Sequence, residues 1–475
     1  MLVDFAKSHF LQFWEQGGRP ALLFSYTPMK DWKPQDKKPG VEIIDAILYQ
    51  LPETCFASDV DTSTIDEVRR LCYHFYLRTY FRQWRSQFGW KHSWLDINNS
   101  FESYVQYYWN KLNQHKINIA VFAGAPHNGS DIILYYVCKV LGIKTLICTA
   151  SLFPNGMWLH QDIEDVGADE IQSRFAPISM EIDDNPIPPF YMKGAGKMSF
   201  LEFVGGVTKQ SSRIAVKGVT LSFLWNPRSF EKNFFKLRAT HRSFNLHQRA
   251  KALYSEFEPD KNYIYFPLHL QPEQTTDIYG GKYADQLLAI EELARALPKD
   301  ILIYVKENPK QTLYMRDPSF FRRLRDIPAV RYFSVEVSTY DLTRHSLAVA
   351  TISGTAGWEA IQMGKPVICF GYGWYRGLPG VFEWRQVKNR VAEALSGFKF
   401  DKDQLRKVVL HRSRCLWPGI LDHHYGELVE NYDPDVAAAE AAKSILSYLR
   451  IIGVDELGNP LPSAEPSAPD LAKTA

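Results

Sequence analysis

The chain has 475 residues, of which 45% are hydrophobic, 14% aromatic and 23% charged. This composition excludes a disordered protein, a collagen-like fibre and a disulfide miniprotein, and the length suffices for two or three domains. Fifty-five Lys and Arg residues against 53 Asp and Glu residues give a net charge of +2, which disfavours nucleic acid as a partner. Six scattered Cys residues favour reduced thiols, and no segment has the length of a membrane span. We therefore expect a cytoplasmic protein.

The first part of the chain, up to about residue 115, is rich in aromatic and basic residues. Residues 66–90 predict an amphipathic helix in which apolar side chains such as Phe75 alternate with arginines such as Arg78. In the simpler interpretation this helix packs through its aromatic face and its arginines are in solvent. The other interpretation is a surface for a membrane or an anionic glycan, with the protein peripheral at the cytoplasmic face of the membrane.

A strand-loop-helix-strand pattern follows. Residues 117–122 have the continuous apolar character of a buried parallel strand, residues 132–141 have helical spacing, and residues 144–149 predict the next strand. The loop after the first strand contains His127 and Asp131, at the sheet edge where ligands gather. In one interpretation His127 is a general base that Asp131 orients. In the other, Asp131 caps the helix and His127 is a turn residue.

A second α/β pattern begins near residue 256. It predicts strands over 262–268, 301–305, 330–334, 347–352 and 366–370, and helices over 282–297, after Pro318, over 357–363 and over 435–450. Two such halves predict an α/β fold of two Rossmann-like domains facing a cleft, with helical additions near the N-terminus. The expected divisions are an N-terminal domain of residues 1–255, a C-terminal domain of residues 256–452 and a disordered tail of residues 453–475.

The segment after the predicted strand 347–352 has the strongest signal for a ligand. Ser353, Gly354 and Thr355 lie where a helix begins, so small residues, two hydroxyls and free backbone amides could surround a phosphate. Glu359, in the first turn, could accept hydrogen bonds from a ribose. The structural alternative is that the hydroxyls cap the helix and Glu359 offsets its dipole.

Two further strand ends carry polar residues. Lys306, Glu307 and Asn308 follow one strand and could contact a base, a ribose or a phosphate, although such a run is often a solvated loop. His269, Gln271 and Glu273 follow another strand. These side chains are costly to bury without partners, so they indicate a lined cleft.

Several catalytic motifs are absent from the sequence: G-x-G-x-x-G, the Walker loop, G-x-S-x-G and H-E-x-x-H. Their absence disfavours a dehydrogenase, an NTPase, a serine hydrolase and a zinc protease. Asp-x-Asp does not occur beside a predicted strand, and the cysteines lack metal-ligand spacing. We therefore expect no metal site.

Four segments together resemble the capsular polysaccharide biosynthesis proteins, a group that includes the Kdo transferases of capsule assembly. They are APHNGSDIILYYVCKVLGIKT, YIYFPLHLQPEQTT, IYVKENP and ISGTAGWEAIQMGKPVICFG. The similarity covers roughly residues 117–165 and 262–375. It implies GT-B architecture, in which the second domain holds most of a nucleotide-sugar donor, without a metal or another cofactor.

The resemblance also implies residue roles. Ser353 and Thr355 match a Ser/Thr pair that contacts the donor phosphate. Lys306-Glu307-Asn308-Pro309 matches a Lys-x-His-Pro motif of enzymes that use CMP-linked sugars, with Asn308 in place of the histidine. A CMP-sugar is thus favoured over a UDP-sugar. The acceptor would approach from the first domain, where Asp131 or His127 would accept the proton of its hydroxyl.

These observations predict a glycosyltransferase of capsular or surface polysaccharide biosynthesis. It would transfer a sugar, Kdo or a related acidic sugar from a CMP donor, to a hydroxyl of a glycan or glycolipid. Glu359 and Lys306 would hold the nucleoside side, with His269, Gln271 and Glu273 at the sugar. One alternative is an enzyme like the nucleotide-sugar 2-epimerases. Another is a non-catalytic protein of polysaccharide assembly or export.

Overall fold

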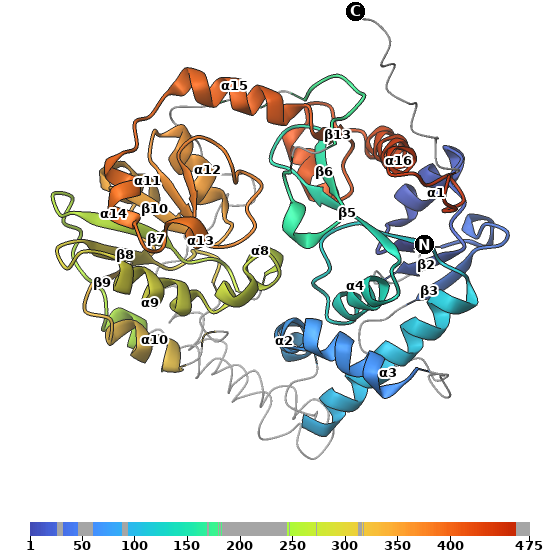
Figure 1. Cartoon of the computed structure of the whole chain (residues 1–475), viewed down its shortest axis with the longest axis horizontal. Coiled ribbons are helices and arrows are strands. Elements are labelled where there is room, and N and C mark those ends of the chain that lie inside the picture. Colours follow the sequence, from blue (N-terminus) through green and yellow to red (C-terminus); the bar gives the residue numbers. More distant parts are fainter. Residues whose placement is uncertain are drawn as a thin grey trace, which may run out of the picture.

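A computed structural model describes residues 1–25, 32–45, 60–87, 94–168, 171–178, 180, 182, 245–246, 248–271, 273–311, 316 and 318–461. In it, two mostly parallel sheets with flanking helices form two lobes side by side (Figure 1). The prediction of two Rossmann-like α/β halves is therefore confirmed. Within these residues, no helix combines the length and the apolar character that crossing a membrane requires.

The first sheet has the strand order β13-β6-β5-β4-β1-β2-β3, and β6 alone runs opposite to the other strands, pairing antiparallel with both β5 and β13. Its strands are β1 (Leu2–Val3), β2 (Leu22–Ser25), β3 (Glu42–Asp45), β4 (Ile119–Phe122), β5 (Lys144–Ala150), β6 (Gly156–His160) and β13 (Leu416–Pro418). The helices and 3₁₀ turns around it are α1 (Lys7–Glu15), η1 (Pro34–Asp36), α2 (Thr62–Gln87), α3 (Trp94–Gln114), α4 (Ser130–Val140), η2 (Ile163–Asp165), η7 (His423–Leu428) and α16 (Pro434–Ile451).

The second sheet is entirely parallel, in the order β12-β11-β10-β7-β8-β9. Its strands are β7 (Tyr263–Pro267), β8 (Leu302–Lys306), β9 (Val330–Phe333), β10 (Ala348–Thr351), β11 (Val367–Cys369) and β12 (Val381–Glu383). The helices and turns of this lobe are α8 (Gln274–Asp277), η5 (Gly281–Ala284), α9 (Gln286–Ala296), α10 (Pro318–Arg325), α11 (Thr339–His345), α12 (Thr355–Gln362), α13 (Trp384–Val387), α14 (Val391–Ser396) and α15 (Lys402–Ser413).

Strand β7 shows why this sheet forms. Its residues Tyr263 to Phe266 are all buried, and alternate side chains enter two separate cores. Tyr263 stacks on Tyr304 of β8 with ring centroids 3.8 Å apart. The chain runs from β7 outward to β9 and then returns through β10 to β12 on the other side. The strand order therefore reverses between β7 and β10, and such a switch point opens a crevice beyond the strand ends.

The end of the chain returns to the first sheet. Helix α15 leads from the second lobe toward the first, where β13 pairs with β6 and Trp417 packs against Tyr448 of α16 (Figure 1). The segment expected as the C-terminal domain therefore contributes a strand and a helix to the first lobe. Residues 453–461, expected within a disordered tail, form a turn closed by a bridge between Val454 and Pro460. Residues 462–475 lie outside the described residues.

The two lobes contact each other through aromatic and polar groups. Trp374 of the second lobe stacks on Trp158 of β6 with ring centroids 5.6 Å apart. The hydroxyl groups of Tyr279 and Thr149 lie 2.9 Å apart across the same interface. Arg78 of α2 donates to the carbonyl of Gly281 at 3.1 Å. The expected helix of residues 66–90 is thus present as α2, but Arg78 bridges the lobes instead of lying in solvent.

Candidate functional site

The candidate site lies at the carboxyl ends of β7, β8 and β10. His269 follows β7 by two residues, Lys306 ends β8, and Ser353 follows β10 by two residues. Because β7 lies between β8 and β10, the three loops meet at one edge of the sheet. The predicted second-lobe residues therefore lie around the switch point between β7 and β10.

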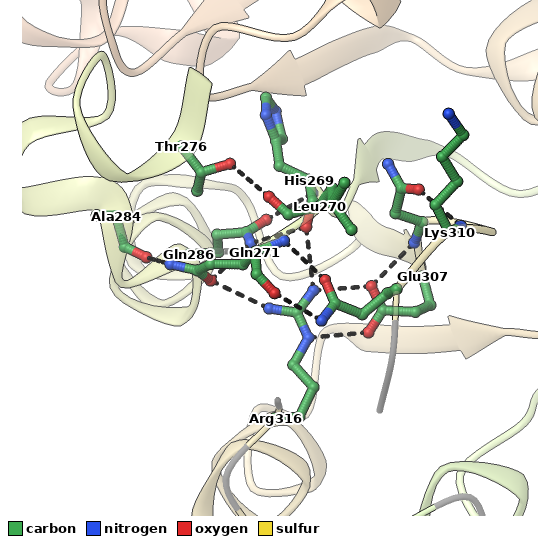
Figure 2. Close-up of polar contacts among 11 residues, drawn as sticks. His269, Leu270, Gln271, Thr276, Ala284, Gln286, Glu307, Lys310 and Arg316 are labelled. Carbon is green, nitrogen blue, oxygen red and sulfur yellow. Dashed lines mark hydrogen bonds and ion pairs between the residues drawn. The ribbon is translucent and has the colours of Figure 1, made fainter. Parts of the chain in front are cut away.

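A buried ion pair organises these loops. Arg316 donates through Nε and Nη2 to the two carboxylate oxygens of Glu307, at 3.0 and 2.7 Å (Figure 2). Both side chains are about 95% buried, with exposures of 4% and 5%. Arg316 also donates to Oε1 of Gln271 at 3.1 Å and to the carbonyl of His269 at 3.2 Å. This arginine thus connects two loops that the sequence analysis treated separately.

Two glutamine side chains hold the backbone of the loop after β7. Gln286 accepts from the amide of His269 at 2.7 Å and donates to its carbonyl at 3.1 Å. Gln311 makes the same pair of contacts with the backbone of Gln271, both at 2.8 Å. Gln271 itself donates to Asp277. It also donates to the carbonyl of Ala284 (Figure 2). Gln271 and Glu307 therefore position the loops, and a direct contact of either with a sugar or nucleotide stays a prediction.

His269 connects the loops after β7 and β10. Its Nε2 accepts from the amide of Ile352 at 3.2 Å and lies 2.8 Å from Oγ1 of Thr351, which places the ring proton on Nδ1. Burial, with a smaller effect of Arg316, lowers the pKa of His269 to about 4. The ring is therefore neutral near pH 7. A Cβ added at Gly354 would lie 2.7 Å from Cε1 of His269, so this contact requires glycine.

The Ser353–Thr355 segment forms the entrance to α12. Gly354 is the N-cap residue and provides no side-chain cap for the first-turn amides, so the simple capping role expected for Ser353 is wrong. Ser353 donates instead to the carbonyl of Thr275 at 2.5 Å, and the Tyr375 hydroxyl donates to the carbonyl of Gly354 at 2.7 Å. These two hydrogen bonds hold the segment in place. The N-terminus of α12 presents its backbone N–H donors at the switch point.

Two ionisable groups at this edge are costly to charge. Lys306 is 5% exposed and donates to Oγ1 of Thr339 at 2.9 Å, and burial lowers its pKa to about 8. Within the described residues, no carboxylate lies in ion-pair distance of its ammonium group. Burial also raises the pKa of Glu359 to about 7. A ligand that offers negative charge to Lys306 and hydroxyl groups to Glu359 would stabilise both charged forms.

Asn308 and Glu273 have local contacts. The side-chain Oδ1 of Asn308 accepts from the backbone amide of Lys310 at 2.9 Å. The backbone amide of Asn308 donates to Oε1 of Glu307, also at 2.9 Å. Glu273 caps α8 by accepting from the amide of Gln274 at 3.1 Å. Both residues shape the turns in which they lie, and their predicted ligand contacts stay predictions.

The first-lobe candidates occupy one loop but have different surroundings. Asp131 is buried and accepts from the amides of His127 and Asn128 at 3.0 and 2.7 Å, and burial raises its pKa to about 7. Nδ1 of His127 lies 2.7 Å from the carbonyl of Ala125. That carbonyl orients the ring, whereas Asp131 shapes the loop. Gly129 is the N-cap of α4, so Asp131 lies in the first turn of the helix and is not its cap.

Arg316, Gln286 and Gln311 are the site residues that sequence reasoning missed. The one available signal was Glu307, because a carboxylate buried at a strand end needs a cationic partner. Elsewhere in the described residues, Asp422, His423 and His424 form one exposed group whose side chains could approach a metal ion. Asp422 is the N-cap residue of η7, and the two histidines begin this turn.

The comparisons with known proteins agree with the sequence motifs. Residues 231–397 match the family model described as "Capsule polysaccharide biosynthesis protein", which covers the second sheet from β7 to β12. The predicted resemblance to that family is therefore confirmed over this segment. No curated protein matches the chain.

Several solved structures are similar at low identity. KpsC of Thermosulfurimonas dismutans, a beta Kdo 2,7 transferase, is 11% identical, with a TM-score of 0.31 and coverage of 78% of this chain and 95% of that chain. The UDP-GlcNAc 2-epimerase of Methanocaldococcus jannaschii is 14% identical, with a TM-score of 0.24 and coverage of 66% and 81%. HepE of Anabaena, in complex with UDP-glucose, is 9% identical, with a TM-score of 0.23 and coverage of 94% and 99%. These values assign no role to any residue of this chain.

Proposed function

We propose that this chain is a glycosyltransferase of capsular or surface polysaccharide biosynthesis. It would have GT-B architecture and move a sugar from a nucleotide donor to a hydroxyl of a glycan or glycolipid. The observation that carries the proposal is the position of Lys306, a buried cation without a carboxylate partner in the described residues, at the same sheet edge as the α12 N-terminus. The match to the capsule family supports the polysaccharide context.

The donor phosphate would lie between Lys306 and the first turn of α12. The ammonium group offers a positive charge, and the backbone amides after Gly354 offer donors without any side-chain cap. As the sugar leaves, negative charge grows on the phosphate oxygen, and both features stabilise that charge without a metal ion. Ser353 and Thr355 contribute hydroxyl groups, and Glu359 accepts from the ribose.

The donor class is an acidic sugar linked to CMP, with Kdo as the first candidate. The likeness of Lys306-Glu307-Asn308-Pro309 to the Lys-x-His-Pro motif supports this choice, whereas the family match supports the capsule context alone. Asn308 offers an amide to cytosine or phosphate but no positive charge. Lys306 is therefore the one cation of this four-residue sequence, so donor binding should depend strongly on it.

The acceptor hydroxyl would approach from the first lobe, with His127 as the base. A proton on Nδ1, donated to the Ala125 carbonyl, makes Nε2 the acceptor atom. Asp131 is less suited because its carboxylate is buried and accepts two backbone amides. The enzyme would act in the cytoplasm, peripherally at the membrane where a glycolipid acceptor is presented.

The test begins with thermal unfolding of the purified protein in the presence of CMP, CDP, UDP or GDP. A nucleotide that binds the native state raises the melting temperature, and we expect CMP to give the largest rise. Incubation with the intact donor, with and without a glycan acceptor, then separates transfer from conversion of the donor alone. Conversion without acceptor would identify an enzyme like the 2-epimerases. Absence of binding to every nucleotide and intact donor would identify a non-catalytic assembly protein.

A further inference from the structure

A cavity in the same lobe has a lining that differs from the residues of the switch point. It is an open pocket with a volume of about 690 Å³, lined by residues of the turn at η5, of α9, of the segment after β11 and of the region of α13. None of Lys306, Ser353, Thr355 and Glu359 lines it. Its size falls in the range of small-molecule sites, roughly 300–1,000 Å³.

Four cationic side chains line this cavity: Lys282, Arg295, Arg385 and Lys388. Lys282 pairs with Glu292 at 2.9 Å, whereas Arg295 lies 3.9 Å from Glu291. Arg385 donates to the Tyr372 hydroxyl at 2.8 Å, and no carboxylate of the described residues lies in ion-pair distance of Arg385 or Lys388. The cavity therefore carries an excess of positive charge over its one lining carboxylate.

That carboxylate is already satisfied. The two oxygens of Glu292 accept from Lys282 at 2.9 Å, from the Tyr283 hydroxyl at 2.7 Å and from the Trp384 indole at 2.8 Å. Burial alone would raise the pKa of Glu292, but these hydrogen bonds lower the pKa below its ordinary value. The carboxylate is therefore ionised, and the ammonium group of Lys282 balances its charge. Arg295, Arg385 and Lys388 are exposed, so an incoming anion can reach them, although Arg295 also forms a long ion pair with Glu291 and Arg385 donates to Tyr372.

The wall also contains an aromatic pair and a close contact between two backbone segments. Trp384 and Phe370 both line the cavity and stack with ring centroids 4.6 Å apart. A Cβ at Gly371 would lie 2.4 Å from the carbonyl of Tyr279, so the backbone approaches closely at the rim. On the same turn, Gly281 is held to the first lobe by Arg78.

We propose that this cavity binds an acidic saccharide of one or two residues, through its carboxylate or phosphate groups. The anionic charge follows from the cavity alone, whereas the saccharide nature rests on the proposed function. The cavity adjoins Tyr279 and Gly281, which contact the first lobe, so a bound saccharide would lie beside the junction between the lobes. The cavity could bind a part of a growing acidic glycan that lies away from its reacting end.

The test is calorimetric titration of the full chain with digalacturonate, with glucose 1-phosphate in a second arm and neutral maltose as the reference. We expect binding of at least one anionic probe, weakened by salt because the cations are exposed, and no binding of maltose. The double variant Arg295→Gln/Lys388→Gln should weaken binding about tenfold. The matched control Arg406→Gln/Lys407→Gln removes the same charges from exposed positions on α15 and should leave binding unchanged.

Equal affinity in the cavity variant and the wild type, equal binding of maltose, or no binding of either anion would overturn the inference. The two anionic arms distinguish a carboxylated from a phosphorylated saccharide. CMP binding is measured on the same samples, and we expect it to be unchanged in the cavity variant. If the protein binds CMP but neither anionic probe, this inference fails and the proposed function stands. If it binds an anionic probe but no nucleotide, the proposed glycosyltransferase function fails and the anion-binding cavity stands.

Discussion

The imidazole of His269 lies directly against Gly354, where a Cβ would meet its Cε1 at 2.7 Å. His269 cannot easily move away, because its Nε2 is held by Thr351 and by the amide of Ile352. This contact sets the position at which α12 begins. The shape of the proposed phosphate site therefore depends on a histidine that remains neutral near pH 7.

Replacing Gly354 by alanine should consequently move the α12 N-terminus. We expect a loss of about 1–3 kcal/mol in the free energy of unfolding, as for other overpacked sites, and about tenfold weaker CMP binding. Urea unfolding and nucleotide titration measure the two effects. Gly397→Ala is the control, because its Cβ would meet Glu393 at an ordinary 3.4 Å. Unchanged CMP affinity in a folded Gly354→Ala variant would contradict the proposed phosphate site.

The ion pair between Arg316 and Glu307 should be essential for stability. Arg316→Met leaves a buried carboxylate without its partner, which costs about 3–5 kcal/mol. The exposed pair of Arg344 and Asp341, with a similar distance of 2.9 Å, provides the control. Arg344→Met should cost less than about 1 kcal/mol. Chemical denaturation of both variants measures the difference, and equal losses would show that Arg316 is not the organising residue.

The site residues at the strand ends could be predicted from the sequence, whereas the residues that hold those loops in place could not. His269, Lys306 and Ser353 follow apolar strands, and the rule that parallel strands end at one edge places them together. Arg316 and Gln286 could not be found in this way, because their partners include the backbone of His269, separated from Arg316 by 47 residues. The return of β13 to the first sheet was missed for a similar reason. Its pairing with β6 depends on a long-range contact that no local pattern encodes.

The buried Lys306 should lower the free energy of unfolding, although it enables donor binding. Its pKa of about 8 in the folded chain lies below the ordinary value of 10.5, so the unfolded chain binds more protons between these pH values. Stability should therefore rise as the pH increases from about 8 to 10.5. Lys306→Met removes this slope, gains on the order of 2–3 kcal/mol at pH 7 and loses CMP binding. Unfolding curves from pH 6 to 11 test this, with the exposed Lys407→Met as control.

Asp131 has the opposite dependence on pH. Burial raises its pKa from 3.8 to about 7, so the folded chain binds more protons than the unfolded chain between these values. Its contribution to stability is complete below about pH 4 and is lost as the pH rises through 7. Asp131→Asn should abolish this slope and weaken the loop, because the amide can present only one oxygen to two backbone donors. A slope that persists in Asp131→Asn would assign it to another group.

His127 should affect turnover without affecting the donor. If Nε2 accepts the proton of the acceptor hydroxyl, His127→Gln keeps a polar side chain but removes the base, and kcat should fall about 10²–10⁴-fold. CMP affinity should stay within a factor of two, because the donor is held by the other lobe. His345→Gln, on the exposed end of α11, controls for loss of a histidine. Steady-state kinetics with donor and glycan acceptor measure kcat and KM separately. An unchanged kcat in a folded His127→Gln variant would show that His127 is not the base. If His127→Gln stays active and Asp131→Asn is inactive, the carboxylate of Asp131 is the base instead.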